Sequence, residues 1–259
     1  MSRAATLFTV PMLLAGTAGC SLGLGEGQVK SDELFAHDCW GANDGGVQGD
    51  VYDLSPDFFA AIPYRTTLQI RVQRGNDLEE VSDGLSVLID DVPKINKEIC
   101  ARLTTSPDCS KADDRGPLLS LVEATPEWQE CPAGTVGFQV ALPPGVNPPG
   151  SPAVPPPDLL NDPPIVHMAL YLHRSCHNQN NVLYAVNGKV CFSRLFSGDP
   201  NERSADNKLT NALFKIQVGD LRDVPLGSYP REIPSELQST VSGYFRFYFE
   251  RGQPGQPFP

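Results

Sequence analysis

The chain has 259 residues, with 20 Lys plus Arg against 31 Asp plus Glu, 25 Pro, 23 Gly, 7 Cys and a formal net charge of −11. So acidic a chain is a poor candidate for binding nucleic acid, because that affinity depends mostly on Lys and Arg side chains that neutralise phosphates. The Pro and Gly content disfavours a bundle of long helices. The length is sufficient to bury a substantial hydrophobic core without metals.

Residues 1–19 are predicted to be a signal peptide. Arg3 supplies a positive charge, and residues 4–16 form an uncharged, mostly apolar stretch. This stretch is too short to span a bilayer, which takes about 20 residues in a helix. It ends in Thr17-Ala18-Gly19-Cys20, small residues followed by a cysteine.

This ending resembles the lipobox of bacterial lipoproteins, with Thr17 at the position where Leu is commonest. The resemblance implies cleavage before Cys20 and acylation of Cys20, for example with palmitate, so that the acyl chains attach the protein to a membrane. Ser21 in the next position favours the outer membrane. The alternative is an ordinary secreted protein with an unlipidated Cys20. Beyond the lipobox, the chain generally resembles envelope lipoproteins of bacteria with large genomes, which identifies no site.

The segment after Cys20 is rich in Gly and Ser and shows no apolar period. Residues 20–35 are therefore predicted to be the lipidated cysteine and a flexible tether.

Period-two alternation of apolar and polar residues recurs along the rest of the chain, which is typical of half-buried antiparallel strands. We predict a mainly β fold, with antiparallel sandwiches that are Ig-like in general architecture. The β-rich parts are residues 36–142 and 165–259, and the clearest strands are 68–72, 85–89, 136–142, 166–172, 214–218 and 241–249.

One segment has a helical period instead. Ile95, Ile99 and Leu103 recur every four residues after Asp91, which could cap a helix, and Pro93, which suits a first turn. A short helix is predicted over 93–103.

Residues 143–164 separate the two β-rich parts and are rich in proline, which lacks the N–H needed for regular hydrogen bonding. The segment is either a linker between two domains or a loop inserted into one sandwich. Both alternatives remain open from the sequence.

Without Cys20 the cysteines number six, and in an exported chain they predict up to three disulfides. Asn187-Gly188 lies between two β-rich runs and predicts a hairpin turn. We therefore expect Cys176 to pair with Cys191, and further pairs between Cys39 and Cys131 and between Cys100 and Cys109.

The best metal candidate is the group His167, His173, Cys176 and His177. His167 and His173 are too far apart along one strand to share an ion, and Cys176 has an obvious disulfide partner, so we expect surface histidines and no metal. A calcium loop around 43–53 lacks the EF-hand spacing. The clustered acids Asp83, Asp90, Asp91, Asp113 and Asp114 are expected to be solvated surface groups rather than catalytic carboxylates.

Motifs for a catalytic nucleophile, a zinc hydrolase or a phosphate-binding loop are missing from the sequence. The positive signal is Tyr244, Arg246 and Tyr248, which share one face of a predicted strand and combine residue types favoured at binding surfaces. We expect a lipid-anchored, non-enzymatic binding, adhesion or assembly module of the cell envelope, without cofactors. Its partner would be an envelope protein or a glycan. The alternatives are a surface hydrolase with an unrecognised site and an accessory substrate-capture lipoprotein.

Overall fold

The computed structural model describes residues 25–40, 47–75, 82–103, 130–143, 164–176, 180–199, 201, 209–225 and 232–249. These residues form ten strands, one α-helix and three short 3-10 helices. The strands are β1 (Gly25–His37), β2 (Val47–Leu54), β3 (Phe58–Tyr64), β4 (Thr67–Gln73), β5 (Gly84–Ile89), β6 (Val136–Gln139), β7 (Val166–Leu172), β8 (Asn181–Arg194), β9 (Leu209–Gly219) and β10 (Ser239–Tyr248). The helices are α1 (Val92–Leu103), η3 (Arg174–Cys176), η5 (Leu221–Asp223) and η6 (Ser235–Leu237).

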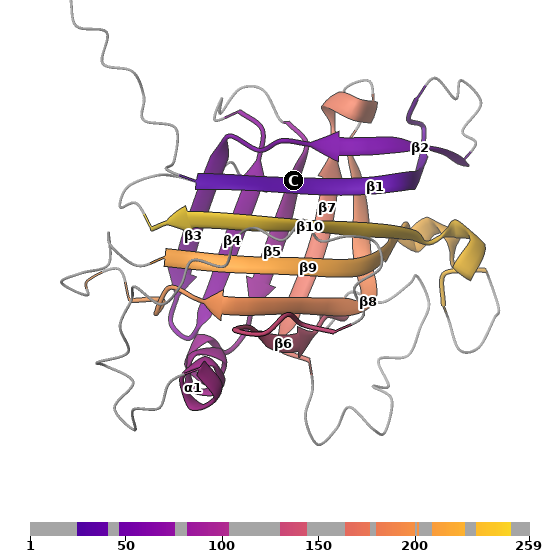
Figure 1. Ribbon diagram of the computed structural model, residues 1–259. Helices are drawn as coiled ribbons and strands as arrows, with labels where there is room; N and C mark the ends of the chain where they lie inside the picture. The colour runs from indigo at the N-terminus through magenta and orange to yellow at the C-terminus, as the bar shows by residue number, and fades with distance from the viewer. Residues whose placement is uncertain are drawn as a thin grey trace, which may run out of the picture.

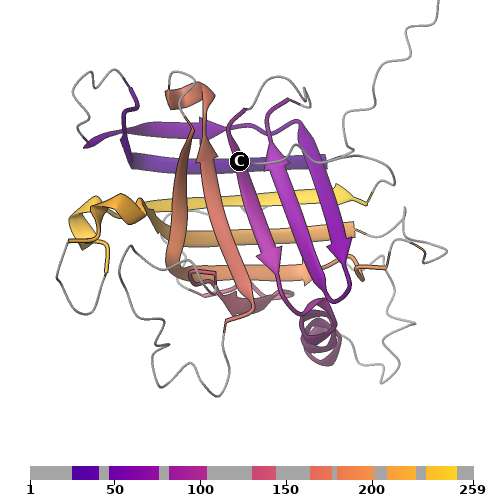
Figure 2. The same cartoon turned by 180° about the vertical axis from the view of Figure 1, so that it is seen from behind.

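All ten strands belong to one sheet, in the order β2-β1-β10-β9-β8-β7-β5-β4-β3, with β6 paired to β8 outside this path. Every strand pair is antiparallel. The sheet curls so that strands β2, β1, β10 and β9 lie in front of strands β3, β4, β5 and β7 and cross them (Figures 1 and 2). The mainly β, antiparallel prediction is thus confirmed. An Ig-like sandwich would consist of two separate sheets, whereas here one curled sheet forms a half-barrel.

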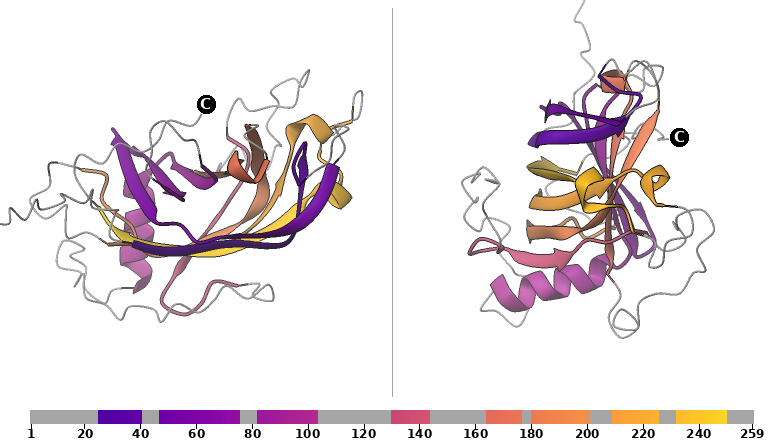
Figure 3. Two further views of the ribbon diagram at one scale, coloured as in Figure 1. Left: turned by 90° about the horizontal axis from the view of Figure 1, so that it is seen from above. Right: turned by 90° about the vertical axis from the view of Figure 1, so that its right-hand side faces the viewer.

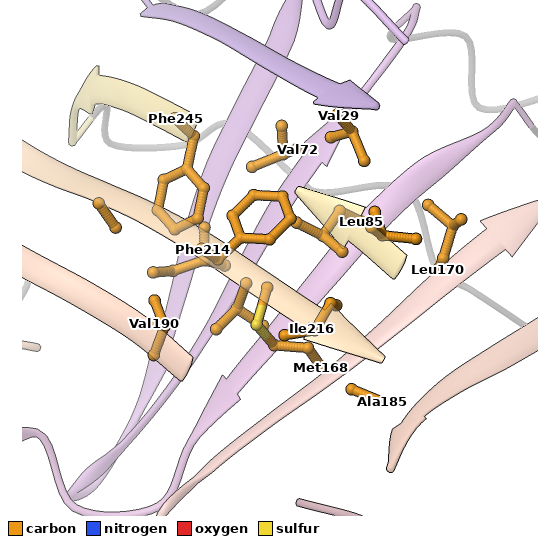
Figure 4. Close-up of a cluster of buried hydrophobic side chains, with 14 of the residues drawn as sticks. Val29, Val72, Leu85, Met168, Leu170, Ala185, Val190, Phe214, Ile216 and Phe245 are labelled. Carbon is orange, nitrogen blue, oxygen red and sulfur yellow. The ribbon is translucent and has the colours of Figure 1, made fainter. Parts of the chain in front are cut away.

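The core lies between the two layers of this half-barrel. Figure 4 shows Phe214 and Phe245 of the front layer facing Val72, Leu85 and Met168 of the back layer. Each of these five side chains is at most 1% exposed. Burying one such side chain contributes about 1.5–3 kcal/mol, so this interface is the main source of stability.

The predicted helix is confirmed as α1, and Asp91 caps it as expected. The Lys94 backbone N–H donates to the Asp91 carboxylate at 2.9 Å. Ile95 is fully buried and Val92 nearly so, at 1% exposure, which explains why this short helix closes one end of the half-barrel in Figure 1.

The prediction of a tether over 20–35 is wrong for residues 25–35, because β1 begins at Gly25 and pairs with β10 on one side and β2 on the other. Its glycines are structural: a Cβ on Gly25 would lie 2.6 Å from the Phe59 ring. Because Gly27 and Ser31 stand where a typical strand has large apolar residues, the period-two signal around the buried Val29 is hidden. The long strands β1 and β10 curve together in Figure 3.

The predicted hairpin at Asn187-Gly188 is also wrong. Residues 181–194 form the single strand β8, and the pair lies at a register shift against β9, between Ala185 and Asn187. Gly188 has φ +130°, and a Cβ there would lie 2.5 Å from the Ile216 Cα. The positive φ of Gly188 therefore occurs inside a continuous strand, next to a β-bulge, and not in a turn.

The disulfide partners differ from those predicted: Cys39 pairs with Cys176, and Cys131 with Cys191. The physical reason is β8. Cys176 and Cys191 could meet only if residues 181–194 folded back as a hairpin. Because these residues form one extended strand, Cys191 lies far from Cys176. Cys100 is disulfide-bonded as well. The expected partner, Cys109, lies outside the described residues, so that pair stays a prediction.

The boundaries predicted at 36–142 and 165–259 do not separate two sheets. Strand β5 precedes the proline-rich segment and pairs directly with β7, which follows it. Strand β1 likewise pairs with β10 across nearly the whole chain. Of the two alternatives left by the sequence, this topology corresponds to a segment inserted into one sheet. Residues 144–163 themselves lie outside the described residues.

Candidate functional site

A polar groove of about 620 Å³ lies on the outer face of the front layer, the face toward the viewer in Figure 1. Strands β1, β10 and β9 form its floor. Its lining is polar except for Phe35 and the ring of Tyr244, and the side chains used below are Gln28, Lys30, Asp32, Glu33, Lys215, Gln217, Thr240, Ser242 and Tyr244.

The alternation of the strands places these side chains on one face. In β10 the core residues Val241, Phe245 and Phe247 alternate with Ser242, Tyr244 and Arg246 on the outside. The same sequence period that builds the core therefore builds the groove.

The register between the strands aligns the outer residues in rows. Lys30 of β1 is opposite Ser242 of β10, which is opposite Lys215 of β9. In the neighbouring rows, Gln28 is opposite Tyr244, and Thr240 is opposite Gln217.

A β-bulge in β1 forms one end of the groove. The register with β2 shifts between Ser31 and Leu34, so that Asp32 and Glu33 are both exposed. The Phe35 backbone N–H beyond the bulge donates to the Ser239 hydroxyl at 2.7 Å. The bulge therefore gathers two carboxylates at this end, because it breaks the alternation that would otherwise turn one of them inward.

Hydrogen bonds already order several groove side chains. The Gln217 side-chain amide donates to the Thr240 hydroxyl at 2.9 Å, and the Gln28 amide donates to Asp53 at 3.3 Å. Lys30 is 3.9 Å from the other oxygen of Asp53. Because Lys30 and Asp53 are both about half exposed, their ion pair adds little stability and is readily exchanged.

The predicted recognition residues Tyr244, Arg246 and Tyr248 continue the groove along β10. Tyr244 lines the groove itself, and Tyr248 is 41% exposed. Arg246 is 3.3 Å from Glu26 of β1. The back layer packs against the opposite face of β10, which carries Val241, Phe245 and Phe247, and so does not cover these three side chains. Sequence reasoning missed Gln28 and Lys30, because Gly27 and Ser31 hide the alternation around Val29 that would have placed them on an outer face.

A second polar cluster lies beside the Cys39 and Cys176 disulfide. His37 contacts Asp223 at 2.5 Å. Arg222 forms hydrogen bonds with Asp220 and Asn181, and the hydrogen bond to Asp220 is the main cause that raises the pKa of the Arg222 guanidinium. No hydroxyl or thiol in the described ranges is hydrogen-bonded to the His37 ring. The cluster joins β1, β8 and η5 and so has a structural role.

The histidines and acids considered from the sequence are mostly structural. His167 is only 3% exposed, so its prediction as a surface histidine is wrong. The His167 ring contacts the Ala141 carbonyl at 2.8 Å and Asp90 at 3.2 Å. Burial is possible because both ring nitrogens have partners.

Asp83 is also buried, at 7% exposure, rather than solvated as expected. Its carboxylate accepts hydrogen bonds from the His173 and Ser175 backbone N–H groups and from the Ser175 hydroxyl. It therefore fixes the turn that follows β7. Asp113, Asp114 and His177 lie outside the described residues.

Within the described ranges, no three His, Cys, Asp or Glu side chains come together in a way that could hold a metal ion. Cys176 is unavailable as a ligand because it is in a disulfide. Asp50 and Asp53, which the calcium hypothesis placed in a loop, belong to strand β2. No helix in this part of the chain is long and apolar enough to cross a membrane.

Comparison with known proteins gives no relative: neither a protein family, nor a curated protein, nor a solved structure matches the chain.

Proposed function

We propose that the chain is a lipid-anchored protein of the bacterial cell envelope that acts as a non-enzymatic binding module. Its binding surface is the outer face of β1, β10 and β9. The observation that carries the proposal is the groove of about 620 Å³, which opens on this face and includes Tyr244, one of the three predicted recognition residues. Ligand sites of this size commonly combine a concave surface with a few convergent polar groups.

The scaffold suits this role. Outer side chains can vary without changing the core, because the period of two separates the two faces of each strand. Like an Ig-like domain, the chain would use an antiparallel β scaffold to present a ligand surface. The disulfides favour an oxidising compartment. Attachment through Cys20, and the outer membrane as its location, rest on the lipobox resemblance alone.

The binding role is tested with the full chain in detergent on an array of bacterial polysaccharides. Tyr244→Ala, Arg246→Ala and Tyr248→Ala together should abolish retention of the ligand and change the melting temperature little, since their side chains lie outside the core. Tyr64→Ala, which removes a 66%-exposed ring at the β3–β4 turn, is the control. Release of new sugar reducing ends, lost in His37→Ala, would instead indicate a hydrolase.

The anchor has its own test. Cys20→Ser should leave the protein unlabelled by fatty acid, because the acylated sulfur is gone. Unchanged labelling of this variant would refute lipidation at Cys20 and would leave the groove proposal intact.

A further inference from the structure

The floor of the groove along β10 is lined by uncharged polar side chains. In chain order they are Gln238, directly before β10, and Thr240, Ser242 and Tyr244 on its outer face. Successive outer residues of a strand are about 7 Å apart, so the four side chains extend over about 20 Å. A ligand that lies along β10 therefore meets amide, hydroxyl and aromatic groups.

Charged side chains of both signs flank this floor. Lys30, Asp32 and Glu33 of β1 lie on one side, and Lys215 of β9 lies on the other. Lys30 is 3.9 Å from Asp53, and Lys215 also interacts with another group of the chain. The two lysines and two carboxylates of the lining balance each other. The groove therefore favours a ligand without net charge.

The amide groups of two glutamines in the lining have a fixed orientation. The Gln28 amide nitrogen donates to the Asp53 carboxylate at 3.3 Å, and the Gln238 amide nitrogen donates to the Ile233 carbonyl at 2.7 Å. Because carboxylate and carbonyl oxygens only accept hydrogen bonds, neither amide can be turned the other way. The amide oxygen of each glutamine is thus left as an acceptor for a hydroxyl of the ligand.

The floor also supplies donors. The Thr240 hydroxyl oxygen accepts from the Gln217 amide at 2.9 Å, so the hydroxyl proton of Thr240 can be donated to a ligand. The Ser242 hydroxyl can donate or accept. This combination requires a ligand whose groups both donate and accept, as sugar hydroxyls do. A hydrocarbon or a polyether does not meet that requirement.

A peptide main chain is a poorer fit to the same floor. Strand β10 pairs with β1 on one side and with β9 on the other, so its backbone N–H and C=O groups are used within the sheet. A peptide could not be added here as a further strand. Tyr244, which is partly exposed, instead offers a ring against which a sugar face can pack.

We propose that the groove binds a neutral, linear glycan that lies along β10, with sugar hydroxyls on the amide and hydroxyl groups of the floor and one sugar face on the Tyr244 ring. The inference rests on the proposed binding function and names its ligand class. A charged glycan of either sign would lie beside a like charge on the flanks, which disfavours it. Beyond Tyr244, Arg246 is 3.3 Å from Glu26, so charge is balanced there too.

The test uses calorimetry on the full chain in detergent, with the neutral hexasaccharides maltohexaose, cellohexaose and mannohexaose. At least one should bind, and its affinity should stay within about twofold when NaCl is raised from about 0.05 to about 0.5 M, because no ionic contact is screened. Thr240→Val and Gln28→Met each remove a hydrogen-bonding group and should weaken binding about three- to tenfold. Gln139→Met on β6 is the matched control, because Gln139 is exposed and does not line the groove.

Other polymers separate the ligand classes. Oligogalacturonate and chitosan oligosaccharides, which carry negative and positive charges, should bind at least about tenfold more weakly than the neutral glycan. Polyethylene glycol should not bind, because it cannot donate hydrogen bonds. Equal binding of any of these, equal weakening by Gln139→Met, or no binding of the three hexasaccharides would overturn the inference.

Failure of the ligand class and failure of the binding function give different results. If a charged glycan or a Ser- and Gly-rich peptide binds instead, and the Tyr244, Arg246 and Tyr248 variant loses it, the binding module stands and only the neutral glycan is wrong. If the chain retains none of these polymers and nothing on the polysaccharide array, the binding function itself is refuted.

Discussion

Removal of the disulfide between Cys39 and Cys176 should be among the most destabilising changes available in this protein. The disulfide closes a loop over a sequence separation of 137 residues. In the chain-entropy model a loop of this length corresponds to about 5 kcal/mol. The second disulfide provides a shorter path around part of the loop, but this changes the value by only a few tenths of a kcal/mol because the dependence is logarithmic. Domains are stable by about 5–15 kcal/mol in total, so the loss would be large.

The measurement is urea unfolding of the wild-type chain and of the double variant Cys39→Ala with Cys176→Ala. Alanine at both positions also leaves small cavities, because both cysteines are fully buried. The double variant Cys131→Ala with Cys191→Ala should lose slightly less, about 4 kcal/mol, since its separation is 60 residues. A loss below about 1 kcal/mol for the first variant would refute the loop argument.

The connectivity itself has a direct test. Both disulfides join a cysteine before residues 144–163 to a cysteine after them. A chain cut by protease within this segment should therefore run as one band in denaturing gels until it is reduced. Pairs within each half, as the sequence suggested, would release two fragments without reduction.

Two other predictions concern the core and the groove floor. Tyr52→Phe should be neutral or stabilising by about 1 kcal/mol, because the buried Tyr52 hydroxyl has no hydrogen-bond partner among the described residues. Burial raises the pKa of Tyr52 in the folded state, so its contribution to stability is lost as the pH rises above about 10, and Tyr52→Phe should flatten that loss in unfolding measurements. If the loss of stability above about pH 10 were the same in this variant as in the wild type, the raised pKa of Tyr52 would not be its cause. Gly243→Ala places a Cβ 2.0 Å from the Gln28 carbonyl oxygen and should cost about 1–3 kcal/mol in urea unfolding, against little change for Thr240→Ala on the outer face. A stability equal to wild type would mean that β1 and β10 are not held this closely.

The sequence was sufficient to predict the strands whose inner positions are large. In β4, β5, β7 and β10 the residues that belong to the hydrophobic core cluster are Leu, Ile, Val, Met and Phe, so the alternation is visible without a structure. Strand β1 was missed because its inner face is partly Gly27 and Ser31, which are small for a reason that lies elsewhere: Gly27 would meet Phe59 and the Tyr244 carbonyl. The sequence around Gly27 carries no information about these two contacts, because Phe59 and Tyr244 are distant along the chain.

The groove and the disulfide partners depend on contacts of the same long-range kind. Lys30 and Lys215 become neighbours of Ser242 only through the register of β1 and β9 on β10, which joins the two ends of the chain. Asn187-Gly188 shows the opposite failure, in which a strong local signal for a turn lies inside a strand. Of the two residues only Gly188 has the positive φ that the predicted turn would need, and the tertiary structure places it within β8.

The position of the groove follows from the packing beneath it. Gly243 lets the backbone of β1 approach β10 closely, and the Phe214 ring fills the space below this glycine. With both strands held by the core, the bulge at Asp32 and Glu33 is the place where β1 can bend away from regular pairing. Gly27 of β1 and Gly243 of β10 therefore both allow the close approach of these two strands beneath the groove. Evolution of a new ligand preference needs changes only at outer positions such as Lys30 and Lys215, whereas a change at Gly243 would move the groove floor itself.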